Sequence, residues 1–594
     1  MEKQEKIPIV VGVTGHRNIV EEDKPFIKTQ VLKSLKDIQE MCKSKDNTKD
    51  TPIIMLNAFA QGADMLCAEA AFEVGIDIYA VLPCPKEKYI RSFDNETDKN
   101  KLYDYLEKTK RQIIAPDIEK NRDWLKKNID ISDTSYEYRQ LGIYMAEHSH
   151  ILIALWDGKP PRTQFGCGTV EVIKFALEHK FLDEDHLFKP GTINDSAVIW
   201  IKSRREGDGA EVETQKKWLI SNLASRYAQE KEEYIVSDYP PEFITEIISK
   251  TKEYNGEIVS ISDGRVKLWK DIDELDEYRK SLRYHYTKAD ELSYRRNQKP
   301  YTILLLILAI LGTIVASTFM IYDDASLPFM IFPCTAVIGV IIFLCLFGKR
   351  KGFHKKYIKY RAFAEALRIQ FYLSMCLKER EIITNVCDLY SWTQKVDMVW
   401  IDKAIQALSV INTTEKAKTD TNKVIDIWIG RNKKPTGQLS YHSEKRPINL
   451  KKAKKYEKLS KIFRDTTLLL YAVIFVIEIA ACFLKYFEID WFWEGYIFAK
   501  LPWRNFGAII LGGSTVGSLL LSGYWGKLSF DRKADDNEKM IRFYASANER
   551  WNEAKSMPYA DIEKFLKEIA REEIIENGIW CSYVDENRLE INLY

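Results

Sequence analysis

The sequence lacks an excess of either charge, paired cysteines and a secretion signal. Its 88 Lys and Arg are balanced by 86 Asp and Glu, which disfavours binding to nucleic acid or another polyanion. The ten cysteines are scattered, with no CxxC pair and no Cys and His cluster at metal-ligand spacing, so reduced thiols and no metal site are expected. The first apolar segment, 9–13, is too short for a signal peptide. The N-terminal part is therefore expected in the cytosol.

Four long apolar runs stand out from an otherwise polar sequence. They are 301–322, 328–348, 466–487 and 505–526. A helix of about 18 or more apolar residues spans the hydrocarbon core of a bilayer, which is roughly 30 Å thick. Because the runs come in two closely spaced pairs, the sequence predicts an α-helical membrane domain with four transmembrane helices in two hairpins. The alternative for each run is a buried helix of a soluble protein.

Basic residues beside the runs predict how the helices are oriented. Lys and Arg gather before the first run, after the second, before the third and after the fourth, and such residues are retained on the cytoplasmic side. The loop of the first pair carries Asp323 and Asp324 and no base, whereas the loop of the second carries Lys500 and Arg504 as exceptions. The N-terminus, central segment and C-terminus are therefore expected in the cytoplasm.

The N-terminal third alternates short β-branched runs with helical patterns. Strands are expected at 7–13, 53–57, 76–82, 151–156 and 197–202. This alternation predicts an α/β domain with a doubly wound, mainly parallel sheet of about five strands. The predicted parts of the chain are a sheet domain at 1–215, a helical linker at 216–300, hairpins at 301–348 and 466–526, and cytosolic helical segments at 349–465 and 527–594.

Three loops at the carboxyl ends of the predicted strands are rich in glycine and polar residues, and ligands of doubly wound sheets bind at these ends. Helix N-terminal amides, a guanidinium and an imidazole there suit a phosphate group. The candidate ligand-binding residues are Thr14, Gly15, His16, Arg17, Ala60, Gln61, Gly62, Asp64, Trp156, Asp157, Gly158, Gly166, Gly168 and Thr169. The alternative is that each glycine only permits a tight turn.

These loops carry a family resemblance. The motifs VGVTGHR (11–17), LNAFAQGADMLCAEAA (56–71), IALWDG (153–158) and GCGTVE (166–171) resemble the SLOG superfamily. That superfamily includes the Lonely Guy phosphoribohydrolases and the DNA-processing protein of natural transformation. The resemblance covers residues 7–205. It implies a Rossmann-like fold and a nucleotide-derived ligand, with no other cofactor.

The catalytic motif of the hydrolytic SLOG members is altered in this chain. Those members carry PGGxGTxxE, whereas here Glu171 follows Thr169 one position early. Arg139 is the nearest match to the family's catalytic Arg, with a spacing two residues longer. One residue of register rotates a helical side chain by about 100°. Glu171 and Arg139 are therefore weak catalytic candidates, and ligand sensing is favoured over a membrane-tethered nucleotide hydrolase or phosphoribohydrolase.

The segments YRAFAEALR (360–368) and REEIIENGIW (571–580) lie near the predicted hairpins and resemble the SLATT group of two-transmembrane effectors. The resemblance covers residues 270–590. Together with the SLOG-like domain, it implies a multi-pass inner-membrane effector of bacterial antiviral defence, which senses a nucleotide second messenger and disrupts the bilayer or forms a pore. Because four spans are few for a pore, a homo-oligomer is expected. A nucleotide-regulated channel or scaffold is a further alternative.

Polar and small residues inside the predicted spans are candidates for the membrane function. Glu478 lies within the third run, and an intramembrane carboxylate is costly unless it has a role. Gly513 and Gly517 form a GxxxG pattern, which Ser514 and Ser518 extend, and such a surface permits close helix contact or a polar lining. The alternative for Glu478 is a protonated side chain packed on a neighbouring helix.

Overall fold

The computed structural model describes residues 6–161, 167–178, 196–207, 216–222, 234–261, 268, 275–324, 331–377, 386–391, 394, 398–410, 420–430, 437–487, 496–498 and 501–586. The chain divides into two compact units. The sheet unit comprises 1–288, 363–418 and 570–575, and the helical unit comprises 289–362, 419–569 and 576–594. Each unit is thus assembled from segments that are far apart in the sequence.

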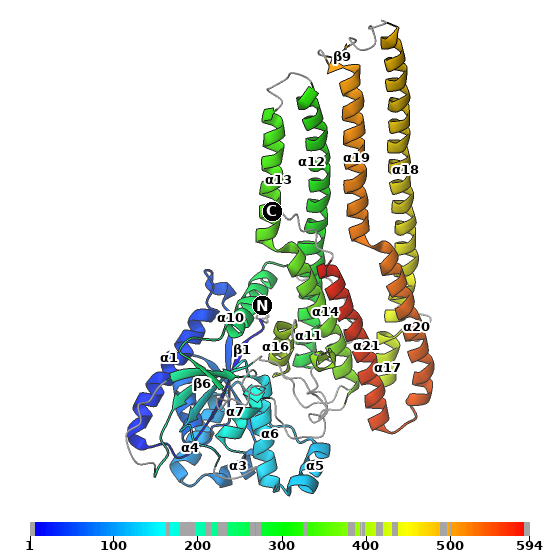
Figure 1. The fold of residues 1–594 in the computed structure, drawn as a ribbon. Coiled ribbons are helices and arrows are strands. Elements are labelled where there is room, and N and C mark those ends of the chain that lie inside the picture. Colours follow the sequence, from blue (N-terminus) through cyan, green and yellow to red (C-terminus); the bar gives the residue numbers. More distant parts are fainter. Residues whose placement is uncertain are drawn as a thin grey trace. The chain divides into compact units, whose positions relative to one another are not determined.

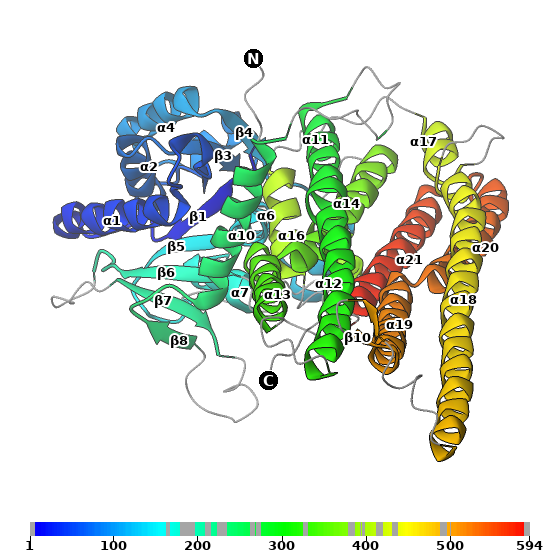
Figure 2. The same ribbon diagram turned by 90° about the horizontal axis from the view of Figure 1, so that it is seen from above.

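The sheet unit contains one mixed sheet of eight strands, in the order β4-β3-β2-β1-β5-β6-β7-β8. The strands are β1 (Ile9–Gly15), β2 (Ile53–Asn57), β3 (Asp77–Leu82), β4 (Arg111–Ile114), β5 (Ile151–Trp156), β6 (Ala197–Lys202), β7 (Lys216–Ser221) and β8 (Tyr234–Ser237). Neighbouring strands from β4 to β6 are parallel, whereas β7 pairs antiparallel with both β6 and β8. Figure 2 shows β5 to β8 side by side. The predicted α/β domain with a mainly parallel sheet is confirmed.

Three strands were not predicted, because none is an uninterrupted apolar run. The short β4 alternates between half-buried and exposed residues, and β8 is largely exposed. β7 begins with two lysines, and only its later residues reach the core. Since β7 pairs with β6, the sheet continues past residue 215, where the sequence predicted the domain to end and a helical linker to begin.

Helices cover both faces of the sheet. Residues of α1, α2, α4 and α10 pack with one face in a single buried cluster, and residues of α6 and α7 pack with the other. The helices wholly or mostly in this unit are η1 (Glu21–Asp23), α1 (Lys24–Cys42), η2 (Asn47–Lys49), α2 (Ala63–Glu73), α3 (Lys86–Tyr89), η3 (Ile90–Ser92), α4 (Glu96–Lys108), α5 (Glu119–Ile129), α6 (Asp133–His148), α7 (Thr169–Glu178), α10 (Glu242–Ile258), α11 (Glu277–Glu291), α14 (Phe353–Cys376), η6 (Val386–Leu389) and α16 (Val399–Ser409). The arrangement is doubly wound.

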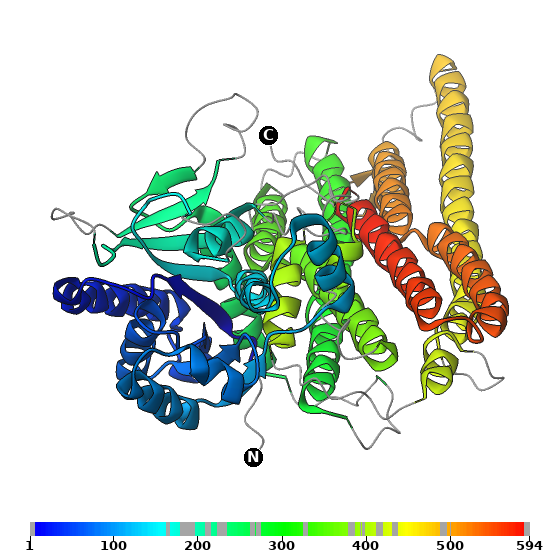
Figure 3. The ribbon, with the colours of Figure 1, turned by 90° about the horizontal axis from the view of Figure 1, so that it is seen from below.

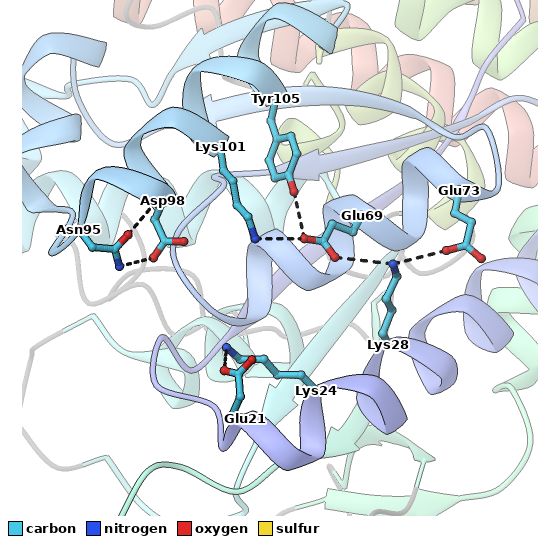
Figure 4. A network of polar contacts seen from close by, with 9 residues as sticks. All are labelled: Glu21, Lys24, Lys28, Glu69, Glu73, Asn95, Asp98, Lys101 and Tyr105. Carbon is cyan, nitrogen blue, oxygen red and sulfur yellow. Dashed lines mark hydrogen bonds and ion pairs between the residues drawn. The ribbon is translucent and has the colours of Figure 1, made fainter.

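Polar contacts join the outer sides of α1, α2 and α4 (Figure 4). Glu69 on α2 accepts a hydrogen bond of 3.0 Å from the Tyr105 hydroxyl on α4 and pairs at 3.6 Å with both Lys28 and Lys101. Lys28 also lies 3.5 Å from Glu73. Exposed ion pairs each contribute little to the free energy of folding. The network therefore orients the three helices relative to one another more than it stabilises the fold.

The helical unit is built from long helices (Figure 1). Its elements are η4 (Leu292–Gln298, a π-helical segment), α12 (Lys299–Asp324), α13 (Ile331–Lys351), α17 (Thr421–Trp428), α18 (Gln438–Tyr486), β9 (Tyr496–Phe498), β10 (Leu501–Pro502), α19 (Trp503–Leu528), α20 (Phe530–Ala554) and α21 (Tyr559–Glu586). Helix α12 packs against α13 and α19, and α19 packs against α18. Helices α20 and α21 form a hairpin, seen in orange and red in Figure 3, in which the rings of Trp551 and Phe565 lie 5.8 Å apart.

The prediction of four membrane spans is met only in part. Within the described residues, two helices are long and apolar enough to cross a membrane, not four: the helix Glu277–Val315, which contains the start of α12, and α18. The other two predicted spans coincide with α13 and α19. Helix α13 ends in three basic residues, Lys349, Arg350 and Lys351. The apolar stretch found in α19 is shorter, Ile509–Tyr524.

Candidate ligand-binding site

A cavity of about 400 Å³ lies at the carboxyl ends of the central strands of the sheet unit. Strand β1 pairs with β2 on one side and with β5 on the other, so the strand order reverses at β1. In the β1 and β5 pair Gly15 lies opposite Leu155, which brings the loops after both strands together. Ligands of doubly wound sheets bind at this switch point.

Nine of the predicted ligand-binding residues line this cavity. They are Thr14, Gly15, His16, Arg17, Ala60, Asp64, Asp157, Gly168 and Thr169. The shared location follows from the parallel topology, which places the loops after β1, β2 and β5 at one edge of the sheet.

Four other predicted residues do not line the cavity. The Gln61 amide donates to Asp98 at 2.9 Å, and Gly62 adopts a φ of +80° with its backbone against the Arg17 carbonyl. Trp156 and Gly158 line a separate pocket that also contains Trp200. These residues shape or flank the loops that carry the cavity. Gly166, the remaining candidate, lies outside the described residues.

The side chain of His16, in the loop after β1, contacts two residues that follow β5, Asp157 and Thr169. Its Nε2 lies 3.2 Å from the backbone nitrogen of Asp157 and 3.1 Å from the carboxylate Oδ1 of the same residue. The amide can only donate to Nε2, whereas the carboxylate can only accept from it, so the two contacts require different protonation forms of the ring. Thr169 Oγ1 lies 3.5 Å from Nδ1. A change of proton on His16 would therefore change its bonding to the loops after β5.

Aromatic and cationic groups form another wall. The Arg17 guanidinium donates to the Tyr138 hydroxyl at 3.0 Å and lies 5.4 Å from the centre of that ring. Tyr89 also lines the cavity and is 1% exposed, and within the described residues its hydroxyl has no hydrogen-bond partner. Burial raises the pKa of Tyr89 well above its usual value, so the hydroxyl stays protonated. A ligand oxygen that accepted from Tyr89 would remove a cost of about 1–3 kcal/mol.

Asp64 lines the cavity and is almost fully buried. Burial raises its pKa to about 7, against the opposing effects of the Ala60 amide and the Arg17 guanidinium. The Ala60 amide donates to Asp64 Oδ2 at 3.3 Å, and the Ala63 amide donates to the His16 carbonyl at 3.1 Å. These amides at the start of α2 are thus used inside the protein, contrary to the expected anion site there.

The N-terminus of α7 supplies the better anion-binding surface. Gly168, Thr169 and Val170 line the cavity, and the first hydrogen bond to Gly168 O comes from Glu171 N at 3.0 Å. The amides ahead of Glu171 precede the intrahelical pattern, and the helix dipole favours negative charge beside them. A Cβ built on Gly168 would meet nothing within 4 Å, so this glycine borders open space.

The charges around the cavity favour an anionic ligand. Arg17, Lys159 and Arg205 line it, together with the carboxyl groups of Asp64 and Asp157. The raised pKa of Asp64 reduces its negative charge near neutral pH, so three cationic side chains lie around the cavity against the carboxylate of Asp157. Within the described part of the chain, no three His, Cys, Asp or Glu side chains group as metal ligands.

The two weak catalytic candidates lie away from this wall. Arg139 is 1% exposed, its guanidinium lies 4.8 Å from the Phe175 ring, and Nη1 is 3.7 Å from Glu171 Oε1. Neither residue lines the cavity. The pair connects α6 to α7. Its position outside the cavity and the shifted register of Glu171 in the sequence both argue against a catalytic role for these two residues.

Sequence reasoning missed two groups of cavity residues, aromatic side chains on helices and basic side chains in the loops after β5 and β6. Tyr89 ends α3, Tyr138 lies on α6, and Lys159 and Arg205 follow strands. No local pattern separates an aromatic side chain that faces a cavity from one that faces the core. The available signal was the topology: α6 leads directly into the central strand β5, so α6 is expected to pack beside the strands that end at the cavity.

The membrane candidates lie in the helical unit. Glu478 is half-buried and shares a face of α18 with Ile474 and the buried Ala481, and Ile474 contacts Gly507 of α19. Glu478 therefore faces α19 rather than the outer side of α18.

The predicted small-residue stripe of α19 packs inside the chain. A Cβ on Gly517 would lie 3.3 Å from Thr313 of α12, and Gly513 is buried. Ser514 donates to the Leu511 carbonyl of its own helix at 3.0 Å, and Ser518 is half-buried.

Comparison with known families gives a match for one segment of the chain. Residues 285–379 match a family described as a protein of unknown function (DUF4231). The match comprises the end of α11, η4, α12, α13 and α14. No curated protein matches the chain.

Proposed function

We propose that this chain is a membrane-embedded effector of a bacterial antiviral defence system. In this proposal the sheet unit is a SLOG-like sensor of a nucleotide-derived second messenger. The helical unit is a SLATT-like module in the inner membrane that disrupts the bilayer or forms a pore as a homo-oligomer. The observation that supports the proposal is the cavity at the β1 and β5 switch point, which is lined by cationic side chains and by Tyr89, whose buried hydroxyl has no hydrogen-bond partner among the described residues.

Large apolar residues on the outside of the helices support four membrane spans. Phe343 on α13 is 65% exposed, Phe475 on α18 is 66% exposed and Leu519 on α19 is 68% exposed, and α12 presents Ile303 and Ile310 in the same way. Contiguous exposed apolar surface of this extent marks a membrane or protein contact. We therefore assign α12, α13, α18 and α19 to the bilayer in two hairpins, with the N-terminus, central segment and C-terminus in the cytoplasm.

Helix α16 offers a route by which the cavity communicates with the membrane segments. It belongs to the stretch between the two hairpins, yet it packs in the sheet unit against α6 and α10. Helix α6 contributes Tyr138, Leu141 and Met145 to the cavity. A ligand that binds one arrangement of α6 better than another shifts the equilibrium toward that arrangement, and α16 is in direct contact with it.

Binding of a nucleotide-derived ligand by the purified full chain tests the site. Gly168→Phe should fill open space and abolish binding without strain, and Arg17→Gln should weaken it by roughly tenfold through loss of one charge-assisted contact. Calorimetric titration with a panel of cyclic oligonucleotides and ADP-ribose derivatives measures both effects. Arg91→Gln, an exposed exchange of the same kind, is the matched control.

Two results would contradict this assignment. The first is unchanged affinity in both cavity variants. The second is release of free base from nucleoside monophosphates that is lost in Glu171→Ala, which would identify the sheet unit as a hydrolase instead.

A further inference from the structure

A second cavity lies within the helical unit. Its volume is about 90 Å³, and it is formed by the first turns of α12, the last turns of α19 and parts of α14, α20 and α21. Its aromatic lining residues are Tyr301, Tyr357, Tyr524, Trp580 and Tyr583. Two of these rings are fixed by packing, since Tyr357 and Trp580 meet edge to face at 5.5 Å.

Two cationic side chains at the start of α20 line the same cavity. The Arg532 guanidinium lies 3.5 Å from the centre of the Tyr583 ring, and its Nε is 3.9 Å from Asp536 Oδ2. Lys533 lies 5.3 Å from the Phe530 ring, and Lys452 lies 5.2 Å from the same ring. Asp536 is the one carboxylate that lines the cavity among the described residues. The local charge is therefore positive.

Repulsion and burial both act on Lys533. Burial lowers its pKa, and the nearby charge of Lys452 lowers it further. An anion in the cavity would stabilise the protonated form against both effects.

Polar contacts hold the cavity walls in place. Ser529, at the break between α19 and α20, has a φ of +46°, and its hydroxyl lies 2.6 Å from the Tyr583 hydroxyl. The Gln298 amide donates to the Tyr357 hydroxyl at 3.0 Å. Two of the four tyrosines that line the cavity, Tyr357 and Tyr583, are thus bonded to neighbouring elements, which preorganises this part of the site.

The position of the cavity relative to the bilayer follows from the proposed membrane topology, in which α12 and α19 cross the bilayer. The inference below therefore rests on that topology. The cavity then lies at the cytoplasmic interface, where Tyr, Trp, Lys and Arg are enriched. Beyond it, toward the bilayer core, α12 exposes Ile307 and Ile310 and α19 exposes Leu519. This surface suits acyl chains, whereas the cavity suits the charged end of the same molecule.

We propose that this cavity binds the phosphate headgroup of an anionic phospholipid from the cytoplasmic leaflet. Basic pockets between transmembrane helices on this side recognise such headgroups. A nucleotide does not fit, because pockets for small-molecule ligands have volumes of roughly 300 Å³ or more. The headgroup would contact α12, α19, α20 and α21 at one site. In the proposed topology these helices connect both hairpins to the cytoplasmic part of the chain.

Native mass spectrometry of the full chain tests the proposal. The protein is purified in detergent and mixed with phosphatidylglycerol or phosphatidylcholine. Wild type should retain phosphatidylglycerol in preference, and Arg532→Gln/Lys533→Gln should lower that retention roughly 10- to 30-fold, since each basic residue at a membrane surface contributes about 1 kcal/mol. Val584→Trp should also lower retention, because it fills the cavity without changing charge.

The control is Arg550→Gln/Lys555→Gln, which makes the same charge change at the far, exposed end of α20 and should retain lipid like wild type. Equal retention in wild type and in both cavity variants would overturn the site. Displacement of phosphatidylglycerol by inorganic phosphate at equal concentration would overturn the lipid as its source. Nucleotide titration of the same preparations reports on the sheet unit separately, so failure here is distinguishable from failure of the sensor proposal.

Discussion

At the scale of the residue, glycines that look equivalent in the sequence have different roles. Gly62 adopts a positive φ, and an added Cβ would lie 2.1 Å from the Arg17 carbonyl, so a side chain there would disturb the fold of two loops. Gly168 faces open space. A pattern of glycines at strand ends therefore predicts the location of a site, whereas only the structure separates the glycine that builds the loop from the one that admits a ligand.

Asp64 should make binding of an anionic ligand depend on pH. Its folded pKa of about 7 lies above the usual unfolded value of about 3.9. The stability it contributes is therefore fully present below about pH 4 and is lost as the pH rises through 7. A bound anion favours the protonated carboxyl, so affinity should rise as the pH falls from 8 toward 6, by at most about tenfold per unit.

Calorimetric titration at several pH values checks this dependence. The groups that act on Asp64 are Arg17, Tyr89 and Cys67, and His16 lines the same cavity. Asp64→Asn should flatten the profile, whereas the exposed Asp94→Asn should keep the wild-type slope. A slope that survives in Asp64→Asn would assign the effect to another group, such as His16.

At the scale of the element, α16 is the helix that we propose as the link between ligand binding and the membrane segments. Its Trp400 donates to the Thr251 hydroxyl of α10 at 3.1 Å, and its Lys403 donates to Ser196 next to β6 at 3.0 Å. Both side chains are buried. These contacts attach α16 to the sheet unit. In the sequence, α16 lies between the helix pair α12 and α13 and the helix pair α18 and α19.

Weakening the attachment of α16 should uncouple the two activities. Trp400→Phe removes the hydrogen bond to Thr251, whose hydroxyl still donates to the Ile247 carbonyl at 2.8 Å, so the expected cost is that of one net hydrogen bond, about 0.5–1.5 kcal/mol. Nucleotide affinity should stay within about twofold, while nucleotide-triggered dye release from vesicles should fall severalfold. Trp218→Phe, the same exchange on strand β7, should leave both measurements unchanged. Parallel loss of binding and release in Trp400→Phe would contradict a coupling role.

Strands that are buried along most of their length have continuous apolar sequences, and these strands were predicted correctly. The five strands with continuous apolar runs were located, whereas β4, β7 and β8 have mixed exposure and depend on neighbours that the sequence does not reveal. The same limit applies to the site. Loops at strand ends were predicted from topology, but Tyr89 and Tyr138 reach the cavity from α3 and α6, where local pattern carries no such information.

At the scale of the whole molecule, the balanced composition conceals two environments. The sheet unit buries its apolar residues in two clusters on the faces of a sheet. The helical unit instead exposes large apolar residues along α12, α13, α18 and α19. Its small residues pack between its own helices, as Gly517 does against Thr313, which leaves the apolar outer surface for lipid or for further copies of the chain.

Nucleotide-dependent dye release from vesicles shows most directly whether nucleotide binding by this chain permeabilises a bilayer. The full chain is reconstituted in dye-loaded vesicles, and the cyclic oligonucleotide or ADP-ribose derivative that binds most tightly is added. We expect little release without nucleotide, rapid release with it, and no release from Gly168→Phe at the same concentration. Equal release with and without nucleotide, or release from Gly168→Phe equal to that of wild type, would contradict the proposed function.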